Sequence, residues 1–475
     1  MKSPLLLLLP LLVIPAVHAA TPQQSSYYTK PYQQQALEIH RKSVSFRSAA
    51  GHGQVPALAN YLAQQFLQAG FPPADVHVLP FTQPSGEKTA GLVVRYRGDD
   101  SLGKRPIMLL AHMDVVDALP KDWERDPFTL IEEDGYFFGR GSLDDKFGTT
   151  QLTSVFLRLK AEGFVPGRDL VIVFTGDEET LMSTTHKLVT DHRDLTDAEF
   201  ALNADAGGGH LDKHGVATFY SVQTSEKSYA SFELTVRNPG GHSSQPRTDN
   251  AIYELADALK ALQDYQFPVR YNDTTRKYFK LSAAVTPGEM GKAMARFASK
   301  PGDARAAAVL SADPALVGIV RTTCVATLLS AGHAENALPQ SATATVNCRI
   351  FPGVAIEDVQ ATLARTINNS AVEILVLGEP VASPASPLRD DVMAAVTTTV
   401  HRQHPGIPII PYQSSYGTDG KQVRIAGIPT YGVIGLFIKP DDMFAHGLNE
   451  RVPVQSFYQA QDHWYVLLKE LAAPL

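Results

Sequence analysis

The chain has 475 residues, of which 44% are hydrophobic and 19% charged, and its formal net charge is −7 at pH 7. At roughly 100–200 residues per domain this indicates a globular protein of two or three domains, and it excludes a largely disordered chain, a collagen and a coiled coil. No run rich in lysine and arginine stands out, so nucleic acid is not an expected partner.

The chain begins with a segment that is typical of targeting. Lys2 precedes an apolar run from Leu5 to Val17, which two prolines interrupt. A membrane helix needs about 20 apolar residues, so this run is too short. Val17 and Ala19 suit the two small positions before a signal-peptidase cut. We expect residues 1–20 to be a cleaved signal peptide, the mature protein to be secreted or periplasmic, and no stable membrane insertion; the alternative is an uncleaved anchor.

Between residues 58 and 222, predicted helices alternate with short apolar strands. Helical periodicity covers residues 58–69 and 152–159. Strands are expected at residues 91–96, 107–111, 170–174 and 200–202. This alternation favours an α/β domain in which helices flank a central sheet.

The block from residue 223 to 384 shows a different pattern. Its strands alternate apolar and polar residues, which predicts an antiparallel sheet with one exposed face. Strands are expected at 231–236, 320–329, 342–350 and 372–377, and helices at 252–262 and 356–367. Residues 267–314, rich in Ala, Lys and Gly, show no clear period. The α/β pattern resumes near residue 385, so an α+β domain (223–384) interrupts one α/β domain (21–222 and 385–475).

The two cysteines, Cys324 and Cys348, match no metal motif, because the chain has no CxxC and no close Cys/His pair. Both lie in predicted strands. Antiparallel pairing of these strands would let the two face each other, and an oxidising compartment would permit a disulfide. The alternative is a pair of buried free thiols.

Histidines and acidic residues follow the predicted strands, where sites of open α/β sheets lie. His112 ends the strand at 107–111 and can bind a metal, while Asp114 can hold the other ring nitrogen. A surface pair is the alternative. Asp144 and Asp145 occupy a glycine-rich loop before a helix. A carboxylate there can bridge two metals, or it can cap the helix.

Three consecutive acids, Asp177, Glu178 and Glu179, end the strand at 170–174. They repel one another unless a cation or a proton relieves them. One can bind a metal while its neighbour acts as a general base. A solvated charge cluster is the alternative.

Asp205 follows the strand at 200–202, and His446 lies near the C-terminal end of the chain. Neither residue alone indicates a function. Five residues together offer nitrogen and oxygen ligands without a thiolate: His112, Asp144, Glu179, Asp205 and His446. Such a set suits two divalent ions such as Zn²⁺.

The order HxD, GRGxxDDK, DEE, D and late H resembles the di-zinc metallopeptidase family of aminoacylase, glutamate carboxypeptidase, carnosinase, succinyl-diaminopimelate desuccinylase and yeast carboxypeptidase S. The resemblance runs from about Tyr32 to the C-terminus. It implies a zinc-exopeptidase-like mixed sheet flanked by helices, with residues 223–384 as a lid or dimerisation domain. It also implies that His112 and Asp205 bind one zinc, that Glu179 and His446 bind the other, and that Asp144 bridges them.

The resemblance implies catalytic roles as well. Asp114 would orient His112, and Glu178 would be the general base. His242, in the segment NPGGHSS, would help to polarise the scissile carbonyl, often from the partner subunit of a homodimer.

Three further residues match positions that hold a substrate carboxylate: Asn336, Arg349 and the backbone of Gly417. Arg349 would confer a preference for a free carboxylate by charge-assisted hydrogen bonds. The alternative for Arg349 is a surface salt bridge.

We therefore expect a metal-dependent hydrolase that cleaves a peptide or amide bond next to a free C-terminal carboxylate. Residues 123–128 resemble the carboxypeptidase S branch. An aminoacylase acting on N-acyl amino acids is the alternative within the class, and other amides are chemically equivalent substrates. An inactive binding relative is a further alternative, which the presence of all five ligands and Glu178 disfavours. Two departures from the family pattern are Ala206 and the long segment 267–314, which could reshape the pocket or alter dimerisation.

Overall fold

The computed structural model describes residues 30–474. The predicted signal peptide lies outside these residues. Within the described chain, no helix combines the length and the apolar character that crossing a membrane requires.

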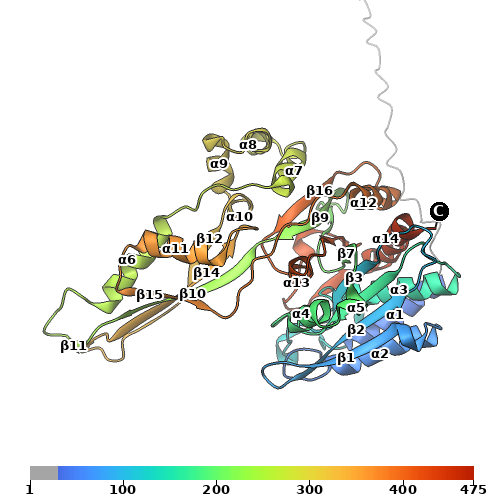
Figure 1. Cartoon of the computed structure of the whole chain (residues 1–475), viewed down its shortest axis with the longest axis horizontal. Coiled ribbons are helices and arrows are strands. Elements are labelled where there is room, and N and C mark those ends of the chain that lie inside the picture. Colours follow the sequence, from blue (N-terminus) through green and yellow to red (C-terminus); the bar gives the residue numbers. More distant parts are fainter. Residues whose placement is uncertain (1–29, 475) are drawn as a thin grey trace, which may run out of the picture.

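The molecule consists of a large lobe and an elongated lobe (Figure 1), for which we use the names catalytic lobe and lid that the family resemblance suggests. The catalytic lobe contains a ten-stranded mixed sheet, and this confirms the predicted fold class. In spatial order its strands are β1 (Val76–Thr82), β2 (Lys88–Tyr96), β6 (Leu170–Thr175), β3 (Ile107–His112), β7 (Phe200–Asn203), β17 (Thr430–Gly432), β9 (Ala217–Glu226), β8 (Gly208–Leu211) and β18 (Phe437–Ile438). A tenth strand, β16 (Ile409–Ser414), pairs with β9.

Helices cover both faces of this sheet. One layer consists of α1 (Lys30–Val44), α2 (Val55–Gln68), α3 (Lys146–Ala161), α12 (Asp390–Gln403) and α14 (Val454–Ala472), and the other of α4 (Ser183–Thr190), α5 (Arg193–Thr196) and α13 (Gly420–Ile425). Side chains of β3 alternate between the layers, with Leu109 facing the first and Leu110 the second. A strand buried on both faces is expected to be largely apolar, and β3 is apolar from Ile107 to Ala111, before its last residue, His112. A small sheet of β19 (Arg451–Pro453), β5 (Tyr136–Phe138) and β4 (Ile131–Glu133) and three 3₁₀ turns complete the lobe.

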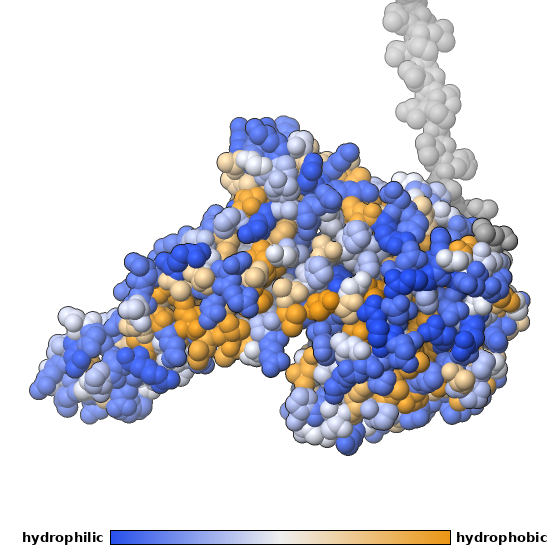
Figure 2. Space-filling model, viewed as in Figure 1, coloured by the Kyte–Doolittle hydropathy of each residue, from blue (hydrophilic) through white to orange (hydrophobic). Residues whose placement is uncertain are grey.

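The lid is built on a four-stranded antiparallel sheet. Its order is β12 (Thr323–Ala331), β14 (Ser341–Ile350), β10 (Ser228–Arg237) and β15 (Val372–Leu377). Helices α6 (Ala251–Asp264) and α11 (Ile356–Ile367) cover one face. β14 alternates half-exposed and buried residues along its whole length, as its sequence pattern predicts. Figure 2 shows hydrophobic residues gathered on the lid between its tip and the catalytic lobe.

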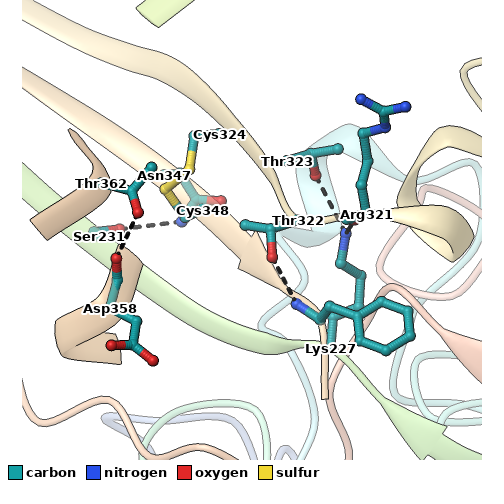
Figure 3. Close-up of a disulfide and its surroundings, with 11 residues drawn as sticks. Lys227, Ser231, Arg321, Thr322, Thr323, Cys324, Asn347, Cys348, Asp358 and Thr362 are labelled. Atoms are coloured by element: carbon teal, nitrogen blue, oxygen red, sulfur yellow. Dashed lines mark hydrogen bonds between the residues drawn. A yellow bond between two sulfur atoms is a disulfide. The ribbon is translucent and has the colours of Figure 1, made fainter. Parts of the chain in front are cut away.

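The two cysteines form a disulfide. Cys324 of β12 and Cys348 of β14 are register partners, and their sulfurs are bonded (Figure 3). The predicted antiparallel pairing is therefore confirmed, and the alternative of two free thiols is wrong.

Residues 267–314 form most of a helical bundle with its own apolar core. The helices are α7 (Asp273–Ser282), α8 (Gly288–Ser299), α9 (Ala304–Ser311) and α10 (Val317–Val320). The predicted strand at 320–329 starts later, at Thr323, because Val320 ends α10. The bundle lies against the catalytic lobe, where the hydroxyl oxygens of Thr274 and Thr224 are 2.7 Å apart.

A two-stranded ribbon, which we call the tip ribbon, pairs β11 (Gly241–His242) with β13 (Ala337–Leu338). Figure 1 places it at the far end of the lid from the catalytic lobe. The chain passes from β9 of the large sheet to β10 of the lid at Lys227. The domain limits at residues 222 and 385 remain predictions.

Candidate metal centre

Five side chains from separate segments converge at the carboxyl-end edge of the large sheet. His112 is the last residue of β3, while Glu179 and Asp205 lie in the loops after β6 and β7. Asp144 lies in the loop before α3, and His446 in the loop before β19. They form two groups of potential metal ligands that share Asp144: His112, Asp144 and Asp205 in one, and Asp144, Glu179 and His446 in the other.

Asp144 presents one carboxylate oxygen to each group. Its Oδ1 lies 3.0 Å from His112 Nε2, and its Oδ2 lies 3.0 Å from His446 Nε2. His446 Nε2 is also 3.0 Å from Glu179 Oε2, and His112 Nε2 is 3.8 Å from Asp205 Oδ1. Within each group the ligand atoms lie within 4.8 Å of one another. This arrangement fits two divalent cations bridged by one carboxylate.

The electrostatics favour cations. Hydrogen bonds to Asp144 and Glu179 raise the pKa of His446 to about 10. Burial opposes protonation of His112, yet the carboxylates of Asp114 and Asp144 raise its pKa well above the usual value. Three carboxylates around two imidazoles therefore produce a strongly negative field. Since His446 is half exposed, the centre is open to solvent on that side.

Asp114 contributes to this geometry in two ways. The ring Nδ1 of His112 donates to the backbone carbonyl of Asp114 over 3.0 Å, and the Asp114 carboxylate lies 3.5 Å from the same nitrogen. That carboxylate accepts from the backbone N–H groups of Glu178 and Glu179. Asp114 thus holds the His112 ring and the acidic loop together.

Glu178 lies beside the centre but belongs to neither ligand group. Its side chain is buried, and burial raises the pKa of its carboxyl well above the usual range. Nearby carboxylates, including Asp419, raise it further, whereas His112 lowers it. A carboxylate with an elevated proton affinity next to a metal centre is suited to proton transfer.

The neighbouring acids have structural partners. Asp145 caps α3 by accepting from Gly148 N over 3.0 Å, so ligand and cap are adjacent residues of one loop. Asp177 accepts from the backbone N–H groups of Ser183 and Thr184 at the start of α4. The acidic run is thus not a solvated charge cluster.

A buried ion pair that sequence reasoning missed supports the ligand loops. Arg140 donates to Glu450 over 2.6 Å and to the backbone carbonyls of His446 and Gly447. Glu450 accepts from the backbone N–H of Asp144 over 3.0 Å. The pair therefore ties the loop of the bridging ligand to the loop of the last ligand. The sequence signal that could have identified this pair is the position of its two residues. Arg140 belongs to the GRG motif, and Glu450 follows His446 by four residues.

Two of the predicted substrate-binding residues lie close together. Arg349 Nη1 donates to the carbonyl of Ser415 over 3.2 Å, two residues before Gly417, and its guanidinium stacks on Tyr229. Within residues 30–474, Arg349 has no ion-pair partner, so the expected alternative of a surface salt bridge is not observed.

The third predicted substrate-binding residue, Asn336, and the predicted catalytic residue His242 lie at the tip ribbon. His242 is exposed and hydrogen-bonded to Ser244. Asn336 is also exposed, and its carbonyl accepts from Ser243 N over 3.1 Å. The chain therefore brings His242 and Asn336 together, but does not bring them to its own metal centre.

Comparison with known proteins agrees with this arrangement. Residues 108–470 match the model of peptidase family M20/M25/M40. The chain is 32% identical over 358 residues to N-fatty-acyl-amino acid synthase/hydrolase PM20D1 of Xenopus tropicalis, covering 73% of this chain and 69% of that one. It is 27% identical over 387 residues to probable carboxypeptidase S-like 2 of Dictyostelium discoideum, covering 80% and 74%.

Solved structures share the fold. The M20 family metallo-carboxypeptidase Sso-CP2 from Sulfolobus solfataricus superimposes with a TM-score of 0.67 at 18% identity, covering 92% of this chain and 99% of that one. The YXEP protein of Bacillus subtilis, described as a dinuclear metal-binding peptidase from the M20 family, gives a TM-score of 0.59 at 12% identity, covering 94% and 100%.

Proposed function

The chain belongs to peptidase family M20/M25/M40 and is a hydrolase of peptide or amide bonds; from this premise we propose that it cleaves the bond next to a free C-terminal carboxylate. One observation carries the proposal: two ligand groups share Asp144 beside the buried Glu178, while Arg349 has no ion-pair partner within residues 30–474.

The residues of the candidate site have separate roles in the proposed reaction. When bound, two metal ions, in our proposal Zn²⁺, lower the pKa of a water molecule and polarise the scissile carbonyl. Glu178 takes a proton from the attacking water as the new C–O bond forms. It then delivers the proton to the amine nitrogen as the C–N bond breaks. Asp114 fixes the orientation of the His112 ring relative to the loop that carries Glu178.

Arg349 and the backbone of Gly417 would bind the substrate carboxylate. A guanidinium forms charge-assisted hydrogen bonds to a carboxylate, and these are stronger than neutral ones. The contact of Arg349 with Ser415, two residues before Gly417, supports a joint role for these two residues.

We further propose a homodimer in which the tip ribbon of one subunit completes the site of the other. His242 and Asn336 are neighbours on an exposed ribbon far from their own metal centre. The edge strand β12 exposes Val325, Leu328 and Leu329. Native proteins seldom leave an apolar edge strand uncovered, and a second copy would cover it.

A second substrate class, N-acyl amino acids, has its own support. Loops that carry metal ligands also expose large apolar side chains: Leu181 close after Glu179, and Met443 and Leu448 on either side of His446. Such a rim suits an apolar acyl group. The similarity to the PM20D1 hydrolase also supports this substrate class.

Secretion after removal of residues 1–20 is part of the proposal.

The central test uses Glu178→Gln with dipeptides and N-acyl amino acids, each as free acid and as C-terminal amide. We expect kcat to fall by about 10²–10⁴-fold with metal content retained, since a general base contributes that much. Wild-type turnover should require metal and favour free acids. Unchanged kcat in Glu178→Gln would remove it from the base role.

The shared site is tested by mixing two inactive variants, Glu178→Gln and His242→Ala. A heterodimer would contain one intact site, so random reassociation restores about a quarter of wild-type activity. No recovery, with subunit exchange demonstrated, would contradict the shared site.

A further inference from the structure

Two tyrosines near the metal centre are not used by the mechanism above. Tyr412 lies in β16, and Tyr416 follows in the loop toward α13. Their phenol oxygens are 2.7 Å apart. The Tyr412 oxygen also accepts from the backbone N–H of Gly207, two residues after the metal-ligand candidate Asp205. The pair thus connects the loop after β16 to a ligand loop.

The directions of these hydrogen bonds follow from the number of available protons. Tyr412 accepts from Gly207, so its own proton is best used toward the Tyr416 oxygen. The reverse direction would leave the Tyr412 proton without a partner near the buried protein interior. The Tyr416 proton is then free, because within residues 30–474 the Tyr412 phenol is the only hydrogen-bond partner that its phenol has.

The position of Tyr416 is between two functional regions. Its backbone lies between Ser415, whose carbonyl holds Arg349, and Gly417. Its phenol extends to the Asp205 side through Tyr412. Tyr416 is about half exposed, so substrate can contact it. A phenol has an ordinary pKa of about 10, so Tyr416 keeps its proton at neutral pH.

We propose that Tyr416 donates a hydrogen bond to the scissile carbonyl oxygen as that oxygen gains negative charge, with Tyr412 as its positioning residue. The inference rests on the proposed hydrolase function. It supplies a donor from the same chain, whereas His242 is at the distant tip ribbon. Donors aimed at developing charge stabilise the transition state more than the ground state.

The test compares Tyr416→Phe and Tyr412→Phe with wild type, using Tyr253→Phe as the control. Tyr253 is an exposed tyrosine on α6, remote from both residues. We expect Tyr416→Phe to lower kcat by about tenfold to 10²-fold with little change in KM, since a single oxyanion donor contributes up to about 10²–10³-fold. Tyr412→Phe should lower kcat less, and Tyr253→Phe should not change it.

A transition-state analogue separates this role from a structural one. A phosphinic dipeptide analogue mimics the tetrahedral geometry, so its Ki should rise in Tyr416→Phe by the factor by which kcat/KM falls. The Ki of the product amino acid should not change. Metal content and the melting temperature are expected to stay at wild-type values.

Three outcomes overturn the inference. They are an unchanged kcat in Tyr416→Phe, a loss confined to KM for free acids, and a loss accompanied by lower metal content. In each case an active, metal-dependent wild type leaves the proposed function standing. A wild type without turnover on any amide would instead refute the proposed function itself.

Discussion

The metal centre and the tip ribbon show two ways in which one chain places functional side chains. At the metal centre, Asp144 is held by a buried ion pair and by helix α3, which its neighbour caps. At the tip, His242 is exposed on two short strands. The difference teaches that the chain itself holds its candidate metal ligands in place, whereas it leaves His242 exposed and away from them.

The strongest test of this contrast is the buried pair Arg140–Glu450. Glu450→Gln leaves the Arg140 cation buried without its charge partner, so the free energy of unfolding should fall by about 3–5 kcal/mol. Metal content should fall too, because Glu450 holds the backbone of Asp144. Urea unfolding followed by tryptophan fluorescence measures this, since both tryptophans, Trp123 and Trp464, lie in the catalytic lobe. An unchanged midpoint with full metal content would contradict the role.

Removing the disulfide should affect the lid selectively. The bond closes a loop between residues 24 positions apart, and loss of such a bond costs about 2–4 kcal/mol. Cys324→Ser with Cys348→Ser should therefore speed hydrogen exchange in β12 and β14. Tryptophan fluorescence and metal content should stay as in wild type. A matching loss of fluorescence stability would show that the two lobes unfold as one unit.

Acid should destabilise the catalytic lobe through its buried histidines. Burial lowers the pKa of His463 to about 4, below the ordinary 6.5, so the unfolded chain binds a proton first as the pH falls. Stability is then lost between about pH 6.5 and pH 4, by about 2 kcal/mol at pH 5. His463→Gln should reduce this loss in urea titrations at pH 7 and pH 5. An identical pH dependence in the variant would be evidence against it.

The smallest effect is expected at the tip. Arg247 and Asp249 form an ion pair at 2.7 Å with side chains more than 40% exposed. Asp249→Asn should leave the free energy of unfolding almost unchanged, because water screens such pairs. The urea experiment used for Glu450→Gln gives the direct comparison. A loss as large as at Glu450 would mean that the tip is buried in solution.

The sequence predicted elements well where the pattern was strong. Helix 356–367 and strand 372–377 have their predicted bounds, because apolar periodicity and burial coincide there. The sequence did not predict the helices of the bundle α7–α10, because these helices are short and each packs only a small apolar face against the others.

The candidate site divides in the same way. All five predicted ligands converge, because strand ends bring distant residues to one sheet edge. The sequence did not predict the pairing of Arg140 with Glu450, because the residue types of a buried ion pair are the same as those of an exposed ion pair. The position of His242, exposed on the tip ribbon, depends on the geometry of the lid, which a local pattern does not contain.

The insertion of the lid also sets an order of assembly. Four of the five ligands precede the lid, and His446 follows it. A ribosome must therefore synthesise the whole lid before the last ligand emerges. A chain that is still being made, or one that is truncated within the lid, lacks His446, so the second ligand group stays incomplete until synthesis is nearly finished. For a hydrolase of peptide or amide bonds, this topology would delay activity until the last part of the chain has been made.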